Sequence, residues 1–152
     1  MKANISKKSQ IPELSVPITA DVTSLNWNEL VKQQLKLGGR LFDVIMMDPP
    51  WQLSSSQPSR GVAIGYDSLS DELIKKIPVP KLQPAGFLFI WVINAKYSFT
   101  CKLMDAWGYK LVDEIAWIKK TVNGKIAKGH GFYLQHAKET CLVGIKVFFW
   151  CC

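Results

Sequence analysis

Four runs of apolar residues stand out along this chain, and polar or glycine- and proline-rich segments separate them. The runs cover residues 41–47, 86–93, 111–119 and 138–150. Continuous apolar runs of this length between turn residues are typical of strands buried within a sheet. The pattern therefore predicts four strands.

Three of the intervening segments have a helical pattern of apolar and polar residues. They cover residues 26–37, 70–77 and 95–107, and they predict three helices. Residues that cap or end helices mark their limits: Gly38 and Gly39 after the first helix, Ser68 or Ser70 before the second, Pro78 and Pro80 after it, and Gly108 after the third.

The order of these elements favours an α/β fold. Strands that alternate with helices indicate parallel pairing, with helices on both faces of the sheet. Ligands of such sheets bind beyond the carboxyl ends of the strands, and the tetrapeptide DPPW, residues 48–51, follows the first strand. Residues 1–20 show no periodicity and are expected to form a flexible basic tail before one domain over 21–152.

Composition and charge narrow the class of protein. A chain of 152 residues is the size of one domain, and its net charge of +7 favours an acidic partner such as nucleic acid, or else serves solubility. The four cysteines show no metal-binding spacing, which favours a reduced intracellular compartment. No apolar run reaches the roughly 18 residues of a membrane span, and His130 and His136 lack neighbours that would complete a metal site.

The DPPW tetrapeptide has a chemistry of its own. Asp48 and Pro49 each precede a proline, so the segment is stiff and extended, and the prolines contribute carbonyl groups but no N–H. Hydrogen-bond acceptors without donors suit an amino group, and Trp51 adds a flat apolar surface. A planar ring with an exocyclic amine, such as adenine, satisfies both features. The alternative is a rigid turn in which Trp51 fills the core.

A long loop over residues 119–137 is rich in lysine and glycine. Its lysines can attract phosphate groups, which indicates contact with nucleic acid. The alternative is a solvated basic loop without a partner.

Several blocks of the sequence together resemble one family. DPPW after an aliphatic strand, ADVTSL near the start, GYDSLSDELIKKIPVPKLQPAGFLFIWV, AWGYKLVDEIAWIKK and HAKETCLVGIK follow one another as in the MT-A70 adenine-N6 methyltransferases. The resemblance covers residues 20–146. It implies a Rossmann-like methyltransferase fold, S-adenosylmethionine as methyl donor, transfer to N6 of adenine in DNA or RNA, and a nuclear location.

The resemblance also implies roles for individual residues. Asp48 would bind the target amine and lie against the methionine part of the donor, in a cradle shaped by Pro49 and Pro50. The remaining roles are base contacts by Trp51 and Tyr66 and donor contacts by Asp21, Val22 and Lys138. Each of three residues has an alternative role: Asp21 as a helix cap, Lys138 as a solvated lysine and Tyr66 as a core residue.

Two features depart from the family pattern. The segment QLSSSQPSRGVAIG, residues 52–65, is longer than in the RNA-acting members and resembles the ciliate-type DNA adenine methyltransferases, which slightly favours DNA. Family members continue beyond the CLVGIK strand, so we expect a sheet that is incomplete at the C-terminus, with Phe148, Phe149 and Trp150 partly exposed.

The family also implies a heterodimer with a degenerate member. A non-catalytic nucleic-acid-binding or partner subunit is the alternative function.

Overall fold

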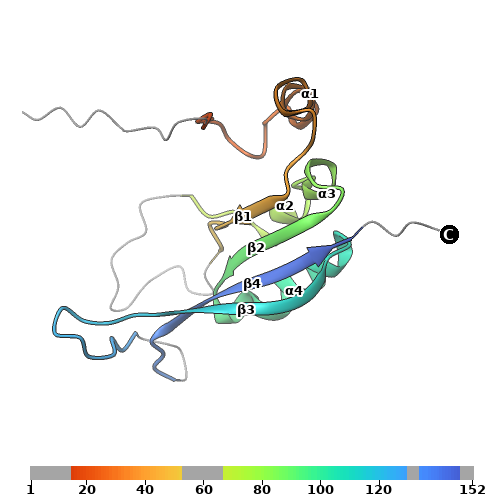
Figure 1. Ribbon diagram of the computed structural model, residues 1–152. Helices are drawn as coiled ribbons and strands as arrows, with labels where there is room; N and C mark the ends of the chain where they lie inside the picture. Colours follow the sequence, from red (N-terminus) through yellow and green to blue (C-terminus); the bar gives the residue numbers. More distant parts are fainter. Residues whose placement is uncertain (1–14, 53–66, 130–133, 148–152) are drawn as a thin grey trace, which may run out of the picture.

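A computed structural model describes residues 15–52, 67–129 and 134–147, and within them one sheet flanked by short helices (Figure 1). The elements in chain order are α1 (Trp27–Gly38), β1 (Val44–Met47), α2 (Asp71–Lys75), α3 (Val79–Leu82), β2 (Gly86–Val92), the 3-10 helix η1 (Asn94–Lys96), α4 (Tyr97–Ala106), β3 (Lys110–Ile118) and β4 (Lys138–Lys146). The four strands and three longer helices match the elements that the sequence predicts. The α/β class is thereby confirmed.

The sheet is mixed and not purely parallel. Its strand order is β1-β2-β4-β3, with β1 parallel to β2 and with β4 antiparallel to both of its neighbours. The prediction of parallel pairing is therefore wrong for two of the three pairings. The physical reason is the connection: a parallel neighbour needs a long crossover, usually a helix, whereas no helix connects β3 to β4 in the described residues and the chain simply turns back. The resulting sheet remains compatible with a Rossmann-like methyltransferase fold.

The helix limits follow from local capping chemistry. Asn26 caps α1, because its side chain accepts a hydrogen bond from the backbone N–H of Glu29 at 3.1 Å. Gly39 adopts the left-handed conformation (φ 70°) that ends the helix. Ser70 caps α2 through the N–H of Leu73. The alternative role of Asp21 as the cap of α1 is excluded, because Asn26 occupies that position.

The short helix α3 was not expected from the sequence, in which Pro78 and Pro80 read as a stop. Pro80 lies in the first turn of α3. Backbone N–H groups there have no partner within the helix, so a proline costs nothing at that position. The two prolines therefore end α2 and begin a new helix.

Apolar side chains fill the space between one face of the sheet and the helices. Leu88 and Ile90 of β2 and Leu142 of β4 are fully buried there against Ile74 and Met104. The opposite face carries the alternate residues of the same strands, and large apolar side chains on it are exposed: Val44, Met46, Phe87, Ile115 and Trp117. Among the described residues, helices thus pack on one face where the sequence led us to expect both.

A buried polar clamp fixes the start of β2. The side chain of Gln83 donates to the carbonyls of Phe42 (3.0 Å) and Phe87 (3.3 Å) and accepts from the Tyr109 hydroxyl at 2.7 Å. Gly86, at φ 141°, lies so close to the backbone of Asp43 that a Cβ would be 2.2 Å from its carbonyl oxygen. These contacts lock the register of β1 against β2, and so the position of the segment that follows β1.

No helix in the described ranges is long and apolar enough to cross a membrane. Strand β4 ends at Lys146. The expected exposure of Phe148, Phe149 and Trp150 lies outside the described residues.

Candidate active site

Three strands end at the same edge of the sheet. Since β4 is antiparallel to both β2 and β3, strands β1, β2 and β3 all run in one direction, and β4 begins where they end. Asp48 follows the last residue of β1 directly. The DPPW tetrapeptide therefore lies at the carboxyl edge, as the sequence predicts, where the open sheets of α/β proteins bind ligands.

Backbone hydrogen bonds hold the tetrapeptide in a tight turn. The Trp51 N–H donates to the Pro49 carbonyl at 2.8 Å, and the Leu69 N–H donates to the Pro50 carbonyl at 2.9 Å. From the sequence we expected the two proline carbonyls to be free of partners, but each of them already accepts one hydrogen bond. A carbonyl oxygen has two lone pairs, so each can still accept one further hydrogen bond. The turn fixes the direction of the remaining lone pairs.

Trp51 lies in the core. It is only 7% exposed, its ring meets that of Phe99 edge to face at 6.2 Å, and its indole N–H donates to the Trp91 carbonyl at 3.0 Å. Strand β1 ends opposite Ile90, so the indole bonds to the next carbonyl along β2. This geometry matches the alternative in which Trp51 fills the core. The residue anchors the turn that carries Asp48 and offers little free surface to a base.

Asp48 is the exposed member of the tetrapeptide. Its carboxylate has no hydrogen-bond partner among the described residues, although it affects a neighbour electrostatically. Burial raises the pKa of the Cys141 thiol, and the negative charge of Asp48 raises it further. Cys141 pairs with Trp91, so these side chains share the face of the sheet opposite the helices. Asp48 therefore presents its charge to that face.

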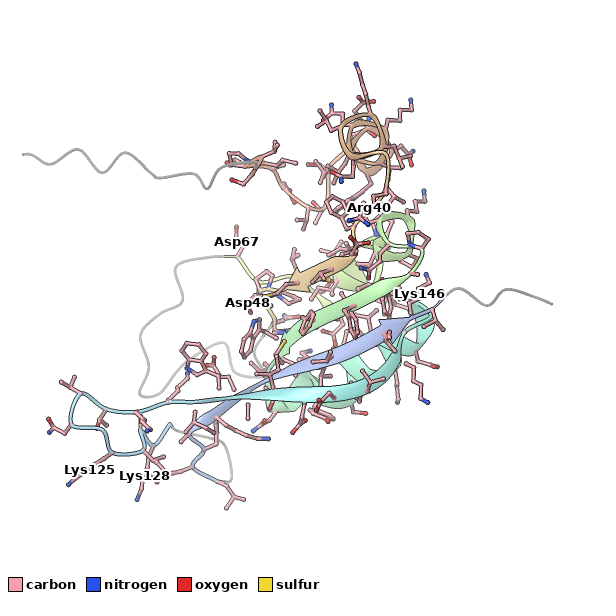
Figure 2. All side chains as sticks on the ribbon, viewed as in Figure 1. Arg40, Asp48, Asp67, Lys125, Lys128 and Lys146 are labelled. Carbon is pink, nitrogen blue, oxygen red and sulfur yellow. The ribbon has the colours of Figure 1, made fainter. Side chains whose placement is uncertain are left out.

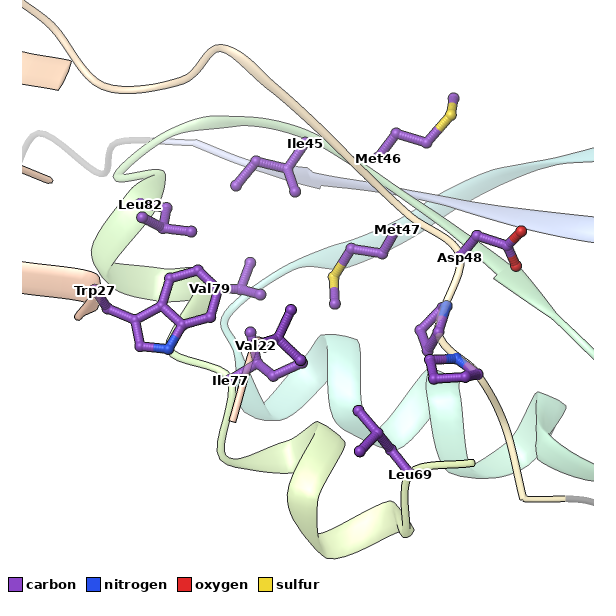
Figure 3. A pocket seen from close by; sticks show the side chains of 12 residues that line it. Val22, Trp27, Ile45, Met46, Met47, Asp48, Leu69, Ile77, Val79 and Leu82 are labelled. Carbon is purple, nitrogen blue, oxygen red and sulfur yellow. The ribbon is translucent and has the colours of Figure 1, made fainter. Parts of the chain in front are cut away.

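A cavity of about 300 Å³ runs along the outer edge of β1. Its walls are almost entirely apolar. Together with Asp48, the residues that line it are Val22, Trp27, Ile45, Met46, Met47, Leu69, Ile77, Val79, Leu82 and the two prolines. Figure 3 shows Ile45 and Met47 directed toward Val22, whereas Asp48 points away from them at the far end. The pocket thus joins Val22 to Asp48, two residues that the sequence assigned to donor binding.

Asp21 precedes the pocket residue Val22 in a short turn. Its Oδ1 accepts from both the backbone N–H and the hydroxyl of Thr23, each at 2.8 Å. These bonds, the backbone one foremost, lower the pKa of the exposed Asp21 carboxyl. Its Oδ2 has no hydrogen-bond partner within the described part of the chain and can accept from a ligand amine.

Lys138 does not join this group. Its ammonium lies 3.7 Å from the Glu114 carboxylate, which also accepts from the Tyr97 hydroxyl at 3.2 Å. Glu114 pairs with Leu142, whose side chain is buried on the helix face. Lys138 thus lies at the carboxyl edge but on the opposite face from Asp48. A contact with the carboxylate of a donor bound in the cavity would require the pair with Glu114 to open.

Two tryptophans that the sequence did not single out lie on the face of Asp48. Trp91 and Trp117 meet edge to face with ring centroids 6.4 Å apart, and Trp117 is 61% exposed. The continuous apolar runs predict strands buried on both faces, so only the strand register shows on which face each tryptophan lies. The predicted base contact Tyr66 lies outside the described residues.

Most of this chain is similar to known proteins. The MT-A70 family model matches residues 42–149. The N(6)-adenosine-methyltransferase catalytic subunit METTL3 of Homo sapiens is 37% identical over 107 residues, which cover 69% of this chain and 17% of the relative. The MT-A70-like N(6)-adenosine-methyltransferase of Arabidopsis thaliana is 36% identical over 107 residues, or 69% of this chain and 15% of the relative. The N(6)-adenine-specific methyltransferase METTL4 of Mus musculus is 32% identical over 126 residues, or 80% of this chain and 24% of the relative. The chain thus spans less than a quarter of the length of these relatives.

Proposed function

Because this chain belongs to the MT-A70 family, we propose that it transfers a methyl group from S-adenosylmethionine to the N6 amine of adenine in nucleic acid. One observation carries the proposal: an exposed carboxylate, Asp48, stands on a rigid turn at the end of an apolar cavity. The relatives are named as adenine or adenosine N6-methyltransferases, and this activity needs both a site for the methyl donor, which the cavity would supply, and an acceptor for the target amine, which Asp48 would supply.

Asp48 and Pro49 bind the target amine. The N6 group of adenine has two N–H donors, and the Asp48 carboxylate and the second lone pair of the Pro49 carbonyl accept them. Two acceptors out of the ring plane draw the nitrogen lone pair out of conjugation and make it nucleophilic. The nitrogen becomes positively charged as it forms its new bond, and the fixed carboxylate stabilises that charge more than it stabilises the neutral ground state. Asp48 is also placed to accept the proton that the amine then loses.

The cavity residues suit part of the donor. Val22 and the other apolar walls match the adenine ring, the free Oδ2 of Asp21 matches its amine, and Asp48 matches the donor ammonium group. When bound, S-adenosylmethionine supplies a methyl group activated by its positively charged sulfur. The role of these residues is to bind and orient it and to keep water from the apolar end of the cavity.

Trp91 and Trp117 supply a surface for the target base. Both lie on the face of Asp48. Aromatic side chains stack on bases that have left the duplex, and this stacking depends little on which base it is. Tyr66 and the small exposed part of Trp51 remain predicted base contacts. In this arrangement the DPPW turn positions the amine, and the two indoles position the ring that carries it.

The substrate and partner are part of the same proposal. The slight preference for DNA over RNA and the nuclear location stay predictions. A second subunit is proposed because the human relative is named as the catalytic subunit of its enzyme. The alternative, a subunit that binds nucleic acid without catalysis, draws its support from the lysines between β3 and β4, which bind phosphate whether or not methyl transfer occurs.

Isotope-labelled S-adenosylmethionine tests the proposal. The chain is incubated with adenine-containing single-stranded DNA and RNA, and with matched strands in which purine replaces adenine and the N6 amine is missing. We expect label in N6-methyladenine from the first set and none from the second. Label on another atom, or binding of the strands without any transfer, would refute the catalytic proposal, and the second outcome would support the binding subunit.

A further inference from the structure

Asp71 and Lys96 form the most enclosed ion pair in the described part of the chain. The Lys96 Nζ donates to both carboxylate oxygens of Asp71, at 2.8 and 2.9 Å. The Lys96 side chain is 19% exposed and that of Asp71 34%, whereas every side chain in the other described pairs is at least 42% exposed. Water and salt screen an enclosed pair less than a surface pair, and loss of one partner leaves the other charge poorly solvated.

Asp71 lies at the start of the segment that meets the DPPW turn. It is the first residue of α2 and follows Leu69 by two positions. The Leu69 N–H donates to the Pro50 carbonyl at 2.9 Å, and Leu69 forms a parallel bridge with Trp51. A shift of Asp71 therefore moves the donor that holds the Pro50 carbonyl.

Lys96 lies on the other side of the turn, where it ends η1 directly before α4. Its backbone N–H donates to the Ile93 carbonyl at 2.8 Å, and its carbonyl accepts from the hydroxyl of the buried Thr100 at 2.8 Å. Phe99, in the first turn of α4, meets the Trp51 ring edge to face. Lys96 is thus a fixed point beside the residue that packs on Trp51.

These contacts form a closed ring around the DPPW turn. In order, the ring joins Pro50, Leu69, Asp71, Lys96, Phe99 and Trp51. Its other links are a backbone hydrogen bond, a contact between aromatic rings and the covalent chain. The ion pair is therefore the link that a substitution can open without altering the turn itself, while the full burial of Ile74 keeps α2 against the core.

We propose that Asp71 and Lys96 are positioning residues for methyl transfer, because their ion pair holds the turn that presents Asp48 and the proline carbonyls to the target amine. The inference rests on the proposed function for the reaction that the turn serves. The pair acts through the backbone of Leu69. A displacement of about 1 Å caused by a substitution away from the chemistry can lower a rate by up to about 100-fold, so a turn held less firmly should react more slowly.

Four variants test the pair. Lys96→Met removes the cation, Asp71→Asn removes the anion with almost no change of size, and Lys96→Arg keeps a charge that can donate to both oxygens. Arg40→Met is the matched control, since it breaks the exposed pair with Asp43. Figure 2 shows Arg40 at the opposite end of β1 from Asp48. Circular dichroism checks the fold, and Asp71→Asn carries the test where Lys96→Met does not fold.

Amide hydrogen exchange followed by NMR examines the turn directly and needs no substrate. We expect the Leu69 amide to exchange about 10-fold faster in Lys96→Met and Asp71→Asn, while the Gly39 amide, bonded at the end of α1, keeps its wild-type rate. Lys96→Arg and Arg40→Met should leave both rates unchanged. Wild-type exchange at Leu69 in Asp71→Asn would overturn the proposal, since the pair would then not hold the donor.

Single-turnover methyl transfer to adenine N6 measures the consequence for the reaction. We expect the rate at saturating donor and single-stranded DNA to fall about 10-fold in Lys96→Met and Asp71→Asn, and to return to within about threefold of the wild type in Lys96→Arg. The half-saturating concentrations should stay within about threefold. An unchanged rate in the folded variants would overturn the proposal in favour of a structural role, and a raised half-saturating donor concentration alone would overturn it in favour of donor binding.

The outcome is separable from that of the proposed function. Methyl transfer by the wild-type chain with an unchanged rate in both variants refutes the positioning role alone. No methyl transfer by the wild-type chain refutes the proposed function, and the positioning role falls with it even where the Leu69 amide exchanges faster in the variants.

Discussion

Replacement of Trp51 tests whether this residue anchors the turn that carries Asp48. In Trp51→Phe the indole N–H is lost and the Trp91 carbonyl that it bonded at 3.0 Å is left without that donor. An unsatisfied buried carbonyl costs about 1–3 kcal/mol, and the smaller ring adds a cavity. We expect the free energy of unfolding to fall by about 2–3 kcal/mol.

Trp51→Ala removes the ring as well. The residue is 7% exposed and packs edge to face on Phe99, so the loss should reach about 4–5 kcal/mol, a large part of the stability of a single domain. Trp117→Ala is the matched control, because that tryptophan is 61% exposed and its removal should cost less than about 1 kcal/mol.

Urea unfolding followed by far-ultraviolet circular dichroism measures all three variants. The order Trp51→Ala, then Trp51→Phe, then Trp117→Ala, from most to least destabilised, supports the anchoring role. If both Trp51 variants unfold within about 1 kcal/mol of the wild type, the indole does not hold the turn and the reasoning is refuted.

Three further predictions concern the frame that positions the site. Gly86→Ala should destabilise by at least about 2 kcal/mol, since its Cβ would meet the Asp43 carbonyl, whereas Gly124→Ala has open space and only the strain of its positive φ; urea midpoints compare them. Gln83→Leu should cost about 2–4 kcal/mol in the same assay, because two backbone carbonyls and the Tyr109 hydroxyl lose their buried partner; a neutral effect would contradict the clamp. Burial raises the pKa of Tyr109 to about 12, above the value near 10 of an unfolded chain. The contribution of this shift to the free energy of unfolding is therefore complete below pH 10 and is lost between pH 10 and about pH 12, at no more than roughly 1.4 kcal/mol per pH unit. Tyr109→Phe should make the decline in stability over that range shallower.

Much of the fold was predictable because it depends on local patterns. The four strands and the caps at Ser70 and Gly39 follow from apolar runs and capping chemistry that a sequence displays directly, whereas the cap of α1 is Asn26 and not Asp21. The direction of β4 was missed, although residues 119–137 lack a helical pattern and therefore favour a turned-back connection. The absent helix outweighs the general preference of α/β proteins for parallel strands.

The site was predictable only in part, because faces depend on register. Asp48 and Val22 border one cavity as expected. Lys138 lies on the opposite face from Asp48 and pairs with Glu114, whereas Trp117 lies on the face of Asp48; both placements depend on how β4 inserts between β2 and β3. Two roles for Trp51 were compatible with the sequence, and the hydrogen bond that supports its core role joins it to Trp91, 40 positions further along the chain.

Methyl transfer by an Asp48 variant tests the central claim most directly. The single-turnover rate of transfer to adenine N6 is measured for the wild type, for Asp48→Ala and for Asp105→Ala, which removes an exposed carboxylate near the end of α4. We expect Asp48→Ala to lower the rate by about 100- to 1,000-fold, as for the loss of one preorganised electrostatic contact, while nucleic-acid binding and the Asp105→Ala rate stay near the wild type. A rate for Asp48→Ala within about threefold of the wild type would contradict the account, because the amine would then react without the carboxylate that is proposed to hold it.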